Sequence, residues 1–236
     1  MFRRNLQRHA LLCWCLLAGG VALLLKHQYS IATAADLDWM LQPLALLLQT
    51  LTGHAFQPNG TGEWHSTAAG IALVKACAGI NFMTMSFLGW CWIMRPPASG
   101  FRWYHAHAWP VQLATALLLA WVTALTVNLA RILLVLAVGP ALDPLLGSTA
   151  AHRLLGLLIY LSALLAQLLI FERRLRTRAV AVAIAIYALV MLLVPLLSGQ
   201  AWLRPAQFGA HALMVLLALL VPVLWIAGAR YAKASR

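Results

Sequence analysis

Charged side chains are scarce in this sequence. Asp, Glu, Lys and Arg together make up 9% of its 236 residues, whereas hydrophobic residues make up 63% and the mean hydropathy is +0.84. A chain of this composition cannot bury its apolar surface inside one soluble core. The scarcity of charge therefore excludes an ordinary soluble protein and predicts an integral membrane protein.

Acidic residues are especially few, with 5 Asp and Glu against 17 Lys and Arg and a formal net charge of +12. In a soluble domain such an excess of positive charge would indicate nucleic-acid binding. Here most basic residues stand in short clusters between apolar runs, which is typical of signals that orient membrane helices. We therefore expect membrane lipid, and no nucleic acid, as a partner.

Long apolar runs organise the chain. They predict an all-α, polytopic transmembrane helix bundle of about six spans, in a single integral membrane domain over residues 1–236. The expected spans are 9–25, 78–94, 108–138, 152–170, 179–197 and 208–228. After the third span, Gly139-Pro140, Asp143-Pro144 and Gly147-Ser148 predict a short loop, and His152 is expected to begin the next helix and span.

Residues 26–76 are the least hydrophobic part of the chain and are expected to form an extracytoplasmic, interfacial segment. Within it, 37–51 is apolar but short for a span, so we expect a helix that lies in the interface or dips into it. Residues 64–76 are expected to be extended or irregular. A rival interpretation of the amino-terminal region is a cleaved signal peptide, since Ala32-Thr33-Ala34 has the small-x-small form of a cleavage site. The long apolar run, and the position of that site well beyond it, favour a retained helix.

The distribution of basic residues orients the predicted spans. With the amino terminus in the cytoplasm, 12 of the 17 basic residues lie inside, whereas a span at 37–51 would invert every later loop and remove this bias. The twelve are Arg3, Arg4, Arg8, Arg95, Arg102, Arg173, Arg174, Arg176, Arg178, Arg230, Lys233 and Arg236. We therefore expect a multi-pass protein of the cell (inner) membrane with both termini in the cytoplasm. Cys77, Arg131 and His152 then share the extracytoplasmic face.

Cys77 is a candidate nucleophile because it follows Lys75 and opens a long apolar run. A thiol at the start of a membrane helix feels the positive end of the helix dipole and the nearby ammonium, and both favour the thiolate. The alternative is that Cys77 packs as a small hydrophobe. That alternative fits Cys13, Cys15 and Cys91 well, since they lie inside predicted spans.

Arg131 and His152 are candidate partners of the thiol. Burying the charge of an arginine at mid-bilayer costs at least ~2.5–3.5 kcal/mol, so Arg131 is expected to have a function or a partner, although it can also snorkel to the interface. Histidine can take the proton of a thiol and return one to a leaving amine, and arginine can stabilise the oxyanion of a tetrahedral intermediate. Asn128, three residues before Arg131, is expected to orient it. Gly79 and Gly156 are expected to let helices approach closely.

Three sequence blocks carry a resemblance to a known family. They are Ala76-Cys77-Ala78-Gly79-Ile80-Asn81-Phe82, Asn128-x-x-Arg131 and His152-x-x-x-Gly156. In order and spacing they resemble the signature blocks of the exosortase/archaeosortase family, and the first is most similar to that of the exosortase K subfamily. The resemblance covers about residues 60–170 and implies that the catalytic helices lie within 77–171.

This resemblance implies a membrane-embedded thiol protease and transpeptidase, a hydrolase that works without a cofactor. Such enzymes act in protein sorting, on exported proteins that end in a sorting signal made of a short motif, a transmembrane helix and a basic cluster. Carried over by position, Cys77 would form an acyl-thioester, Arg131 would stabilise the oxyanion or thiolate, and His152 would be the general acid/base.

Other functions stay open. One is a non-enzymatic small transporter or membrane scaffold in which Arg131 binds an anionic ligand or lipid, although the inverted hydropathy repeat of many transporters is missing. Another is a lipid-linked acyltransferase that uses His152. A serine intramembrane protease is disfavoured because no span carries a Gly-x-Ser-x-Gly pattern. His105-x-His107 lacks the further ligands of a metal site, so no metal is expected there.

Overall fold

The fold is taken from a computed structural model that describes residues 2–68, 70–95, 108–146, 148–171 and 176–234. Within these ranges helices dominate, and six are long and apolar enough to cross a membrane. These spans are His9–Ile31, Lys75–Ile93, Trp109–Leu142, His152–Phe171, Thr177–Leu197 and Pro205–Gly228. The predicted all-α polytopic helix bundle of about six spans is confirmed, and the chain is a multi-pass membrane protein.

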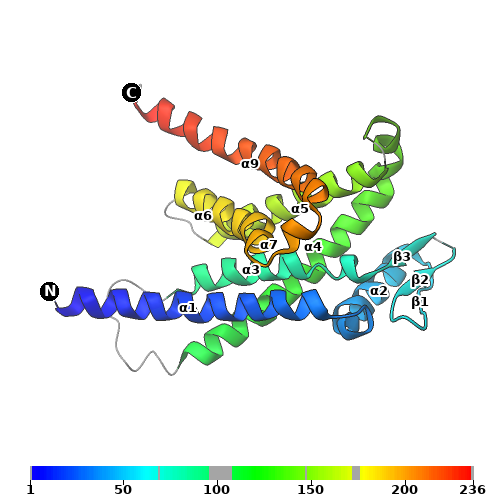
Figure 1. The fold of residues 1–236 in the computed structure, drawn as a ribbon, viewed down its shortest axis with the longest axis horizontal. Coiled ribbons are helices and arrows are strands. Elements are labelled where there is room, and N and C mark those ends of the chain that lie inside the picture. Colours follow the sequence, from blue (N-terminus) through cyan, green and yellow to red (C-terminus); the bar gives the residue numbers. More distant parts are fainter. Residues whose placement is uncertain (1, 69, 96–107, 147, 172–175, 235–236) are drawn as a thin grey trace. The chain divides into compact units, whose positions relative to one another are not determined.

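The chain divides into two compact units, Met1–Leu133 and Leu134–Arg236. The first contains the helices α1 (Phe2–Ile31), α2 (Asp38–Thr52), α3 (Ile80–Ile93) and the beginning of α4 (Trp109–Leu146). The second contains the rest of α4, then α5 (Ser148–Phe171), α6 (Arg176–Ala188), α7 (Val194–Leu197), α8 (Gln200–Leu203) and α9 (Pro205–Ala234) (Figure 1). A single domain over 1–236 stays a prediction.

In the first unit α1 and α3 lie side by side (Figure 1). The indole N–H of Trp14 donates to the carbonyl oxygen of Cys91 at 3.0 Å, and Lys26 contacts Asn81 at the other end of α3, so the helices run antiparallel. Ala18 and Ala22, between Trp14 and Lys26, are also buried. Residues four apart lie on one face of a helix, and small residues there let two membrane helices pack closely. This stripe therefore explains how α1 fits against α3.

The segment that follows α1 begins with a cap. The backbone N–H and hydroxyl of Thr33 donate to Oδ2 of Asp36 at 2.8 and 2.7 Å, and the Asp36 N–H donates back to the Thr33 hydroxyl at 3.3 Å. This reciprocal pair begins a short 3-10 helix, η1 (Ala35–Leu37), which leads into α2. α2 ends at Gly53, whose φ of 72° is left-handed, as is common after a helix. The helix expected at 37–51 is thus present, and its depth in the membrane stays a prediction.

A small antiparallel sheet follows α2, in the order β1 (Gln57–Pro58), β2 (Trp64–Ser66) and β3 (Ile71–Leu73). The indole N–H of Trp64 donates to Oδ1 of Asp38 at 2.8 Å. In the turn before β2, Gly62 has φ +80°, and a Cβ there would lie 2.5 Å from the Cα of Ala35. The sheet is therefore anchored to η1 and to the start of α2. β2 and β3 agree with the extended structure expected at 64–76, and a 3-10 helix, η2 (Lys75–Ala78), completes that stretch.

In the second unit α5 packs against α6 and α9. The hydroxyl of Tyr187 on α6 donates to the carbonyl oxygen of Leu157 on α5 at 2.9 Å. After α6 the chain widens into a π-helix, η4 (Leu189–Leu193), before α7 begins, so the fifth span is a composite of three helical pieces.

The break expected at Gly139-Pro140 and Asp143-Pro144 is wrong, because α4 continues to Leu146 with Pro140 and Pro144 inside it. The break expected at Gly147-Ser148 includes residue 147, which lies outside the described residues. The fourth span begins at His152 as expected, although α5 itself begins at Ser148, so His152 lies in its second turn. A proline removes one helical hydrogen bond and ends many helices in soluble proteins. Membrane helices keep prolines more often, because neighbouring helices and local adjustments satisfy the freed carbonyl groups.

Candidate functional site

Cys77 lies in the 3-10 helix η2, directly before α3. Its backbone N–H donates to the carbonyl oxygen of Val74 at 2.7 Å, and its side chain is half-buried. Gly79 then adopts a left-handed conformation with φ 68° and caps α3, which begins at Ile80. The thiol is thus carried by a turn ahead of the helix, and not by its first turn as the sequence suggested. We call the segment Lys75–Ala78 together with Gly79 the Cys77 turn.

Gly79 also marks a close contact between the Cys77 turn and α4. A Cβ at this position would lie 2.7 Å from Nδ2 of Asn128, closer than real Cβ atoms come to another heavy atom. Its positive φ is a second reason for glycine, because side chains are strained in that region. The expected close approach at Gly79 is therefore present, and the neighbour is the side chain of Asn128.

Asn128 links Cys77 to Arg131. Its side-chain N–H donates to the backbone carbonyl of Cys77, and its Oδ1 accepts a hydrogen bond from Nη1 of Arg131 at 3.3 Å. Asn128 is 1% exposed and Arg131 is 8% exposed, so both side chains are buried. The structure thus brings three of the expected site residues into one hydrogen-bonded chain. A guanidinium held in this way keeps a fixed orientation, which a stabiliser of a developing oxyanion requires.

Lys75 contacts the end of α1. Its ammonium donates to the carbonyl oxygens of Ala32 at 2.6 Å and Ser30 at 3.4 Å, and it lies 5.1 Å from the centroid of the Tyr29 ring. A cation in this place stabilises the negative end of the α1 dipole. Lys75 therefore fastens the Cys77 turn to α1, while a direct effect of its charge on the thiol stays a prediction.

Lys26 also contacts this region, although its sequence position did not predict it. It extends from α1 to Oδ1 of Asn81 in the first turn of α3, and its ammonium lies 5.9 Å from the Tyr29 centroid. The sequence did contain a signal for this residue, namely a lysine at the end of an apolar run. Ionisable residues in membrane helices usually have a partner or a function. The run was expected to end at residue 25, whereas α1 continues to Ile31 and contains Lys26.

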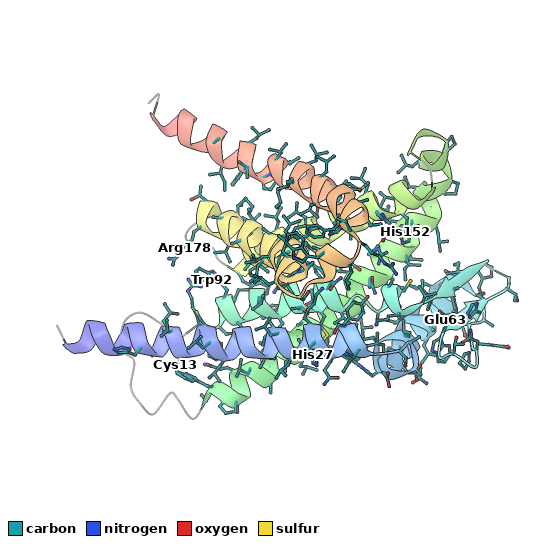
Figure 2. All side chains as sticks on the ribbon, in the orientation of Figure 1. Cys13, His27, Glu63, Trp92, His152 and Arg178 are labelled. Carbon is teal, nitrogen blue, oxygen red and sulfur yellow. The ribbon has the colours of Figure 1, made fainter. Side chains whose placement is uncertain are left out.

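His152 and Gly156 lie in the second unit, on α5. The His152 side chain is exposed within this unit (Figure 2), and Gly156, one turn later, is buried. Arg153 is exposed beside His152. Since Cys77 belongs to the first unit and His152 to the second, a shared site for the two stays a prediction.

The other cysteines lie on membrane helices of the first unit, with Cys13 (Figure 2) and Cys15 exposed on α1 and Cys91 buried on α3. Among the described residues no group of three or more His, Cys, Asp or Glu side chains could hold a metal ion. His105 and His107 fall outside the described residues.

The fold and the site define an all-α, multi-pass membrane protein in which one buried amide joins a cysteine turn to a buried arginine. No known protein-family model, no curated protein and no solved structure matches this chain. The resemblance to exosortases therefore stays a prediction that depends on the three sequence blocks.

Proposed function

We propose that this chain is a membrane-embedded cysteine protease and transpeptidase that cleaves C-terminal sorting signals of exported proteins through an acyl-thioester on Cys77. The observation that carries the proposal is the hydrogen-bonded chain from the Cys77 carbonyl through Asn128 to Arg131. It unites two of the three sequence blocks that resemble the exosortase family. The burial of Arg131 adds support, because a charge is retained in an apolar interior when it has a specific use.

In the proposed reaction the Cys77 thiolate attacks the carbonyl carbon of the scissile peptide bond, and the oxygen becomes an oxyanion. The guanidinium of Arg131 stabilises that oxyanion through its charge and N–H donors. The oxyanion then collapses, the carbon–nitrogen bond breaks, and the amine leaves with a proton from His152. Water, or an amine or hydroxyl of an acceptor molecule, next attacks the thioester, gives a proton to His152 and releases the Cys77 thiolate.

The proposed side of the membrane is the extracytoplasmic face. The positive-inside rule puts 12 of the 17 basic residues in the cytoplasm when both termini are inside. The segment that would then lie outside contains Asp36, Asp38 and Glu63, and it is folded against the Cys77 turn through α2 and β3. A structured segment next to the thiol suits an enzyme that receives an exported protein at the membrane surface.

The test is co-expression with exported proteins of the same cell that end in a transmembrane helix and a basic cluster. Carboxy-terminal cleavage is scored by mass spectrometry for wild type, Cys77→Ala and the control Cys13→Ala, which removes an exposed cysteine of α1. We expect processing in wild type and the control, none in Cys77→Ala, and a trapped thioester in His152→Ala.

Processing that is unchanged in Cys77→Ala would overturn the proposal. It would favour the lipid-linked acyltransferase if activity required His152. It would favour a transporter or scaffold with an anionic ligand at Arg131 if neither residue mattered.

A further inference from the structure

Two lysines lie near one tyrosine ring at the end of α1. The ammonium groups of Lys26 and Lys75 lie 5.9 and 5.1 Å from the centroid of Tyr29. Lys26 belongs to α1 and contacts Asn81, which comes after Cys77, whereas Lys75 comes before Cys77 and contacts the carbonyl groups that end α1. Both contacts therefore join the end of α1 to the segment around Cys77. Lys26 reaches from α1 to a residue after Cys77, and Lys75 reaches from a residue before Cys77 to the end of α1.

The Cys77 turn is consequently held at three points. Lys75 fastens its beginning to α1, Asn128 of α4 holds the carbonyl of Cys77, and Lys26 holds Asn81 two residues after the glycine that ends the turn. That glycine, Gly79, is in the left-handed region, so the direction of the backbone changes between Cys77 and Asn81. A change at Asn81 therefore alters the direction in which the chain leaves the thiol.

The contact of Lys26 is made by a charged donor to a neutral acceptor. Within the described residues neither lysine forms an ion pair with a carboxylate, in contrast to His65, which pairs with Glu63. A charge in an apolar helix is costly, and a neutral side chain would pack α1 against α3 at lower cost, as Trp14 does at the opposite end. A hydrogen bond from a charged donor is about twice as strong as a neutral one, so Lys26 holds Asn81 more firmly than a neutral residue would.

We infer that Lys26 is a positioning residue for the reaction at Cys77, which acts by holding Asn81 and, through it, the Cys77 turn. The inference rests on the proposed function for its effect on turnover. It assigns α1 to the site, whereas the sequence blocks of the site all lie after residue 75.

The experiment compares Lys26→Met, which removes the ammonium at similar length, with Lys26→Arg, which keeps a charged donor. His27→Ala is the matched control, because His27 is the exposed neighbour on the same helix (Figure 2). Displacing a reacting group by about 1 Å can cost 10²-fold in rate, so we expect Lys26→Met to lower kcat by about 10- to 100-fold with KM little changed. Lys26→Arg should restore most of the rate, and His27→Ala should match wild type.

Asn81→Ala removes the same contact from the other side and keeps the lysine. If the contact acts as a unit, the double variant Lys26→Met/Asn81→Ala is no slower than the slower single variant, because residues in one network are not additive. If Lys26→Met does not fold, Asn81→Ala alone tests whether this contact positions the Cys77 turn.

A second readout needs no substrate. The rate at which a membrane-impermeant maleimide alkylates Cys77, measured on the Cys77 peptide by mass spectrometry, should change in Lys26→Met and return in Lys26→Arg. Wild-type kcat and wild-type alkylation in folded Lys26→Met would overturn the inference, and so would additive effects in the double variant. If wild type processes no substrate, the proposed function fails, and the alkylation rates still decide whether Lys26 positions the thiol.

Discussion

The side-chain amide of Asn128 donates a hydrogen bond to the backbone carbonyl of Cys77, 51 residues earlier in the sequence. The same side chain accepts from the guanidinium of Arg131 at 3.3 Å. An asparagine can do both at once because its amide carries a donor and an acceptor on opposite atoms. One residue therefore links the guanidinium of the arginine to the backbone of the cysteine.

Replacement of Asn128 should separate these two functions. Asn128→Asp keeps an acceptor for Arg131 and loses the donor to Cys77, whereas Asn128→Leu loses both. A buried group left without its partner costs about 1–3 kcal/mol, so Asn128→Leu should lower the free energy of unfolding by that amount and abolish processing. We expect Asn128→Asp to lose processing too, with Arg131 still held. Thr126→Ala, on an exposed position of the same helix, is the control. Wild-type processing in Asn128→Asp would show that the bond to Cys77 is dispensable.

Gly79→Ala tests the close approach at the Cys77 turn. A non-glycine residue with left-handed φ costs about 1–2 kcal/mol, and the new Cβ must also displace Asn128. Gly70→Ala is a matched control, because Gly70 has φ +65° and no heavy atom within 4 Å of its Cβ position. Thermal unfolding in detergent should show a larger loss for Gly79→Ala, and only this variant should lose processing. Equal losses would mean that backbone strain alone accounts for the effect and that the contact with Asn128 adds nothing.

Arg131→Lys keeps the positive charge and loses the planar fork of the guanidinium. Lysine cannot both reach Oδ1 of Asn128 and offer several fixed N–H donors to an oxyanion. Loss of one donor to an oxyanion typically costs 10²–10³-fold in kcat, so we expect a decrease of about that size. Arg204→Lys, at an exposed position before α9, should have no effect. If Arg131→Lys retains full kcat, the arginine acts as an anchor in the membrane and not in the reaction.

The cap between Thr33 and Asp36 should make stability depend on pH. The backbone N–H and the hydroxyl of Thr33, followed by the charge of Lys75, hold the pKa of Asp36 below its ordinary value of 3.8. A lowered pKa stabilises the folded state above the ordinary value, and this stabilisation is lost as the pH falls through the lowered one. Unfolding temperatures measured from neutral pH down past 3.8 should therefore fall less steeply for Asp36→Asn and Thr33→Val than for wild type. The same slope in all three proteins would contradict the role of this cap.

The spans of this protein could be predicted because they depend on local composition. Apolar runs of sufficient length indicated each of the six, and the spacing of Asn128 and Arg131 on one helix indicated that they interact. The prolines at 140 and 144 led to the wrong prediction that the helix ends there. Their usual effect on a helix is weaker in a membrane than in water.

The contacts that build the Cys77 turn could not be predicted in the same way. Lys26 meets Asn81 across 55 residues and Asn128 meets Cys77 across 51, and no local pattern indicates which residues of two distant helices meet. The left-handed conformation of Gly79 was equally hidden, since the sequence only suggested that a small residue was needed there. These features follow from the packing of helices and not from the preferences of single segments.

The antiparallel pairing of α1 and α3 bears on the order in which the protein assembles in the membrane. Trp14, Lys26, Asn81 and Cys91, which define that pairing, all precede residue 95. Amino-terminal parts of a chain are synthesised first and can pack while later parts are still being made. We therefore expect a nascent chain that ends before Trp109 to hold its thiol-bearing turn loosely on two lysines, and the arrival of α4 to lock it through Asn128. The cysteine would then acquire its final surroundings only late in biosynthesis.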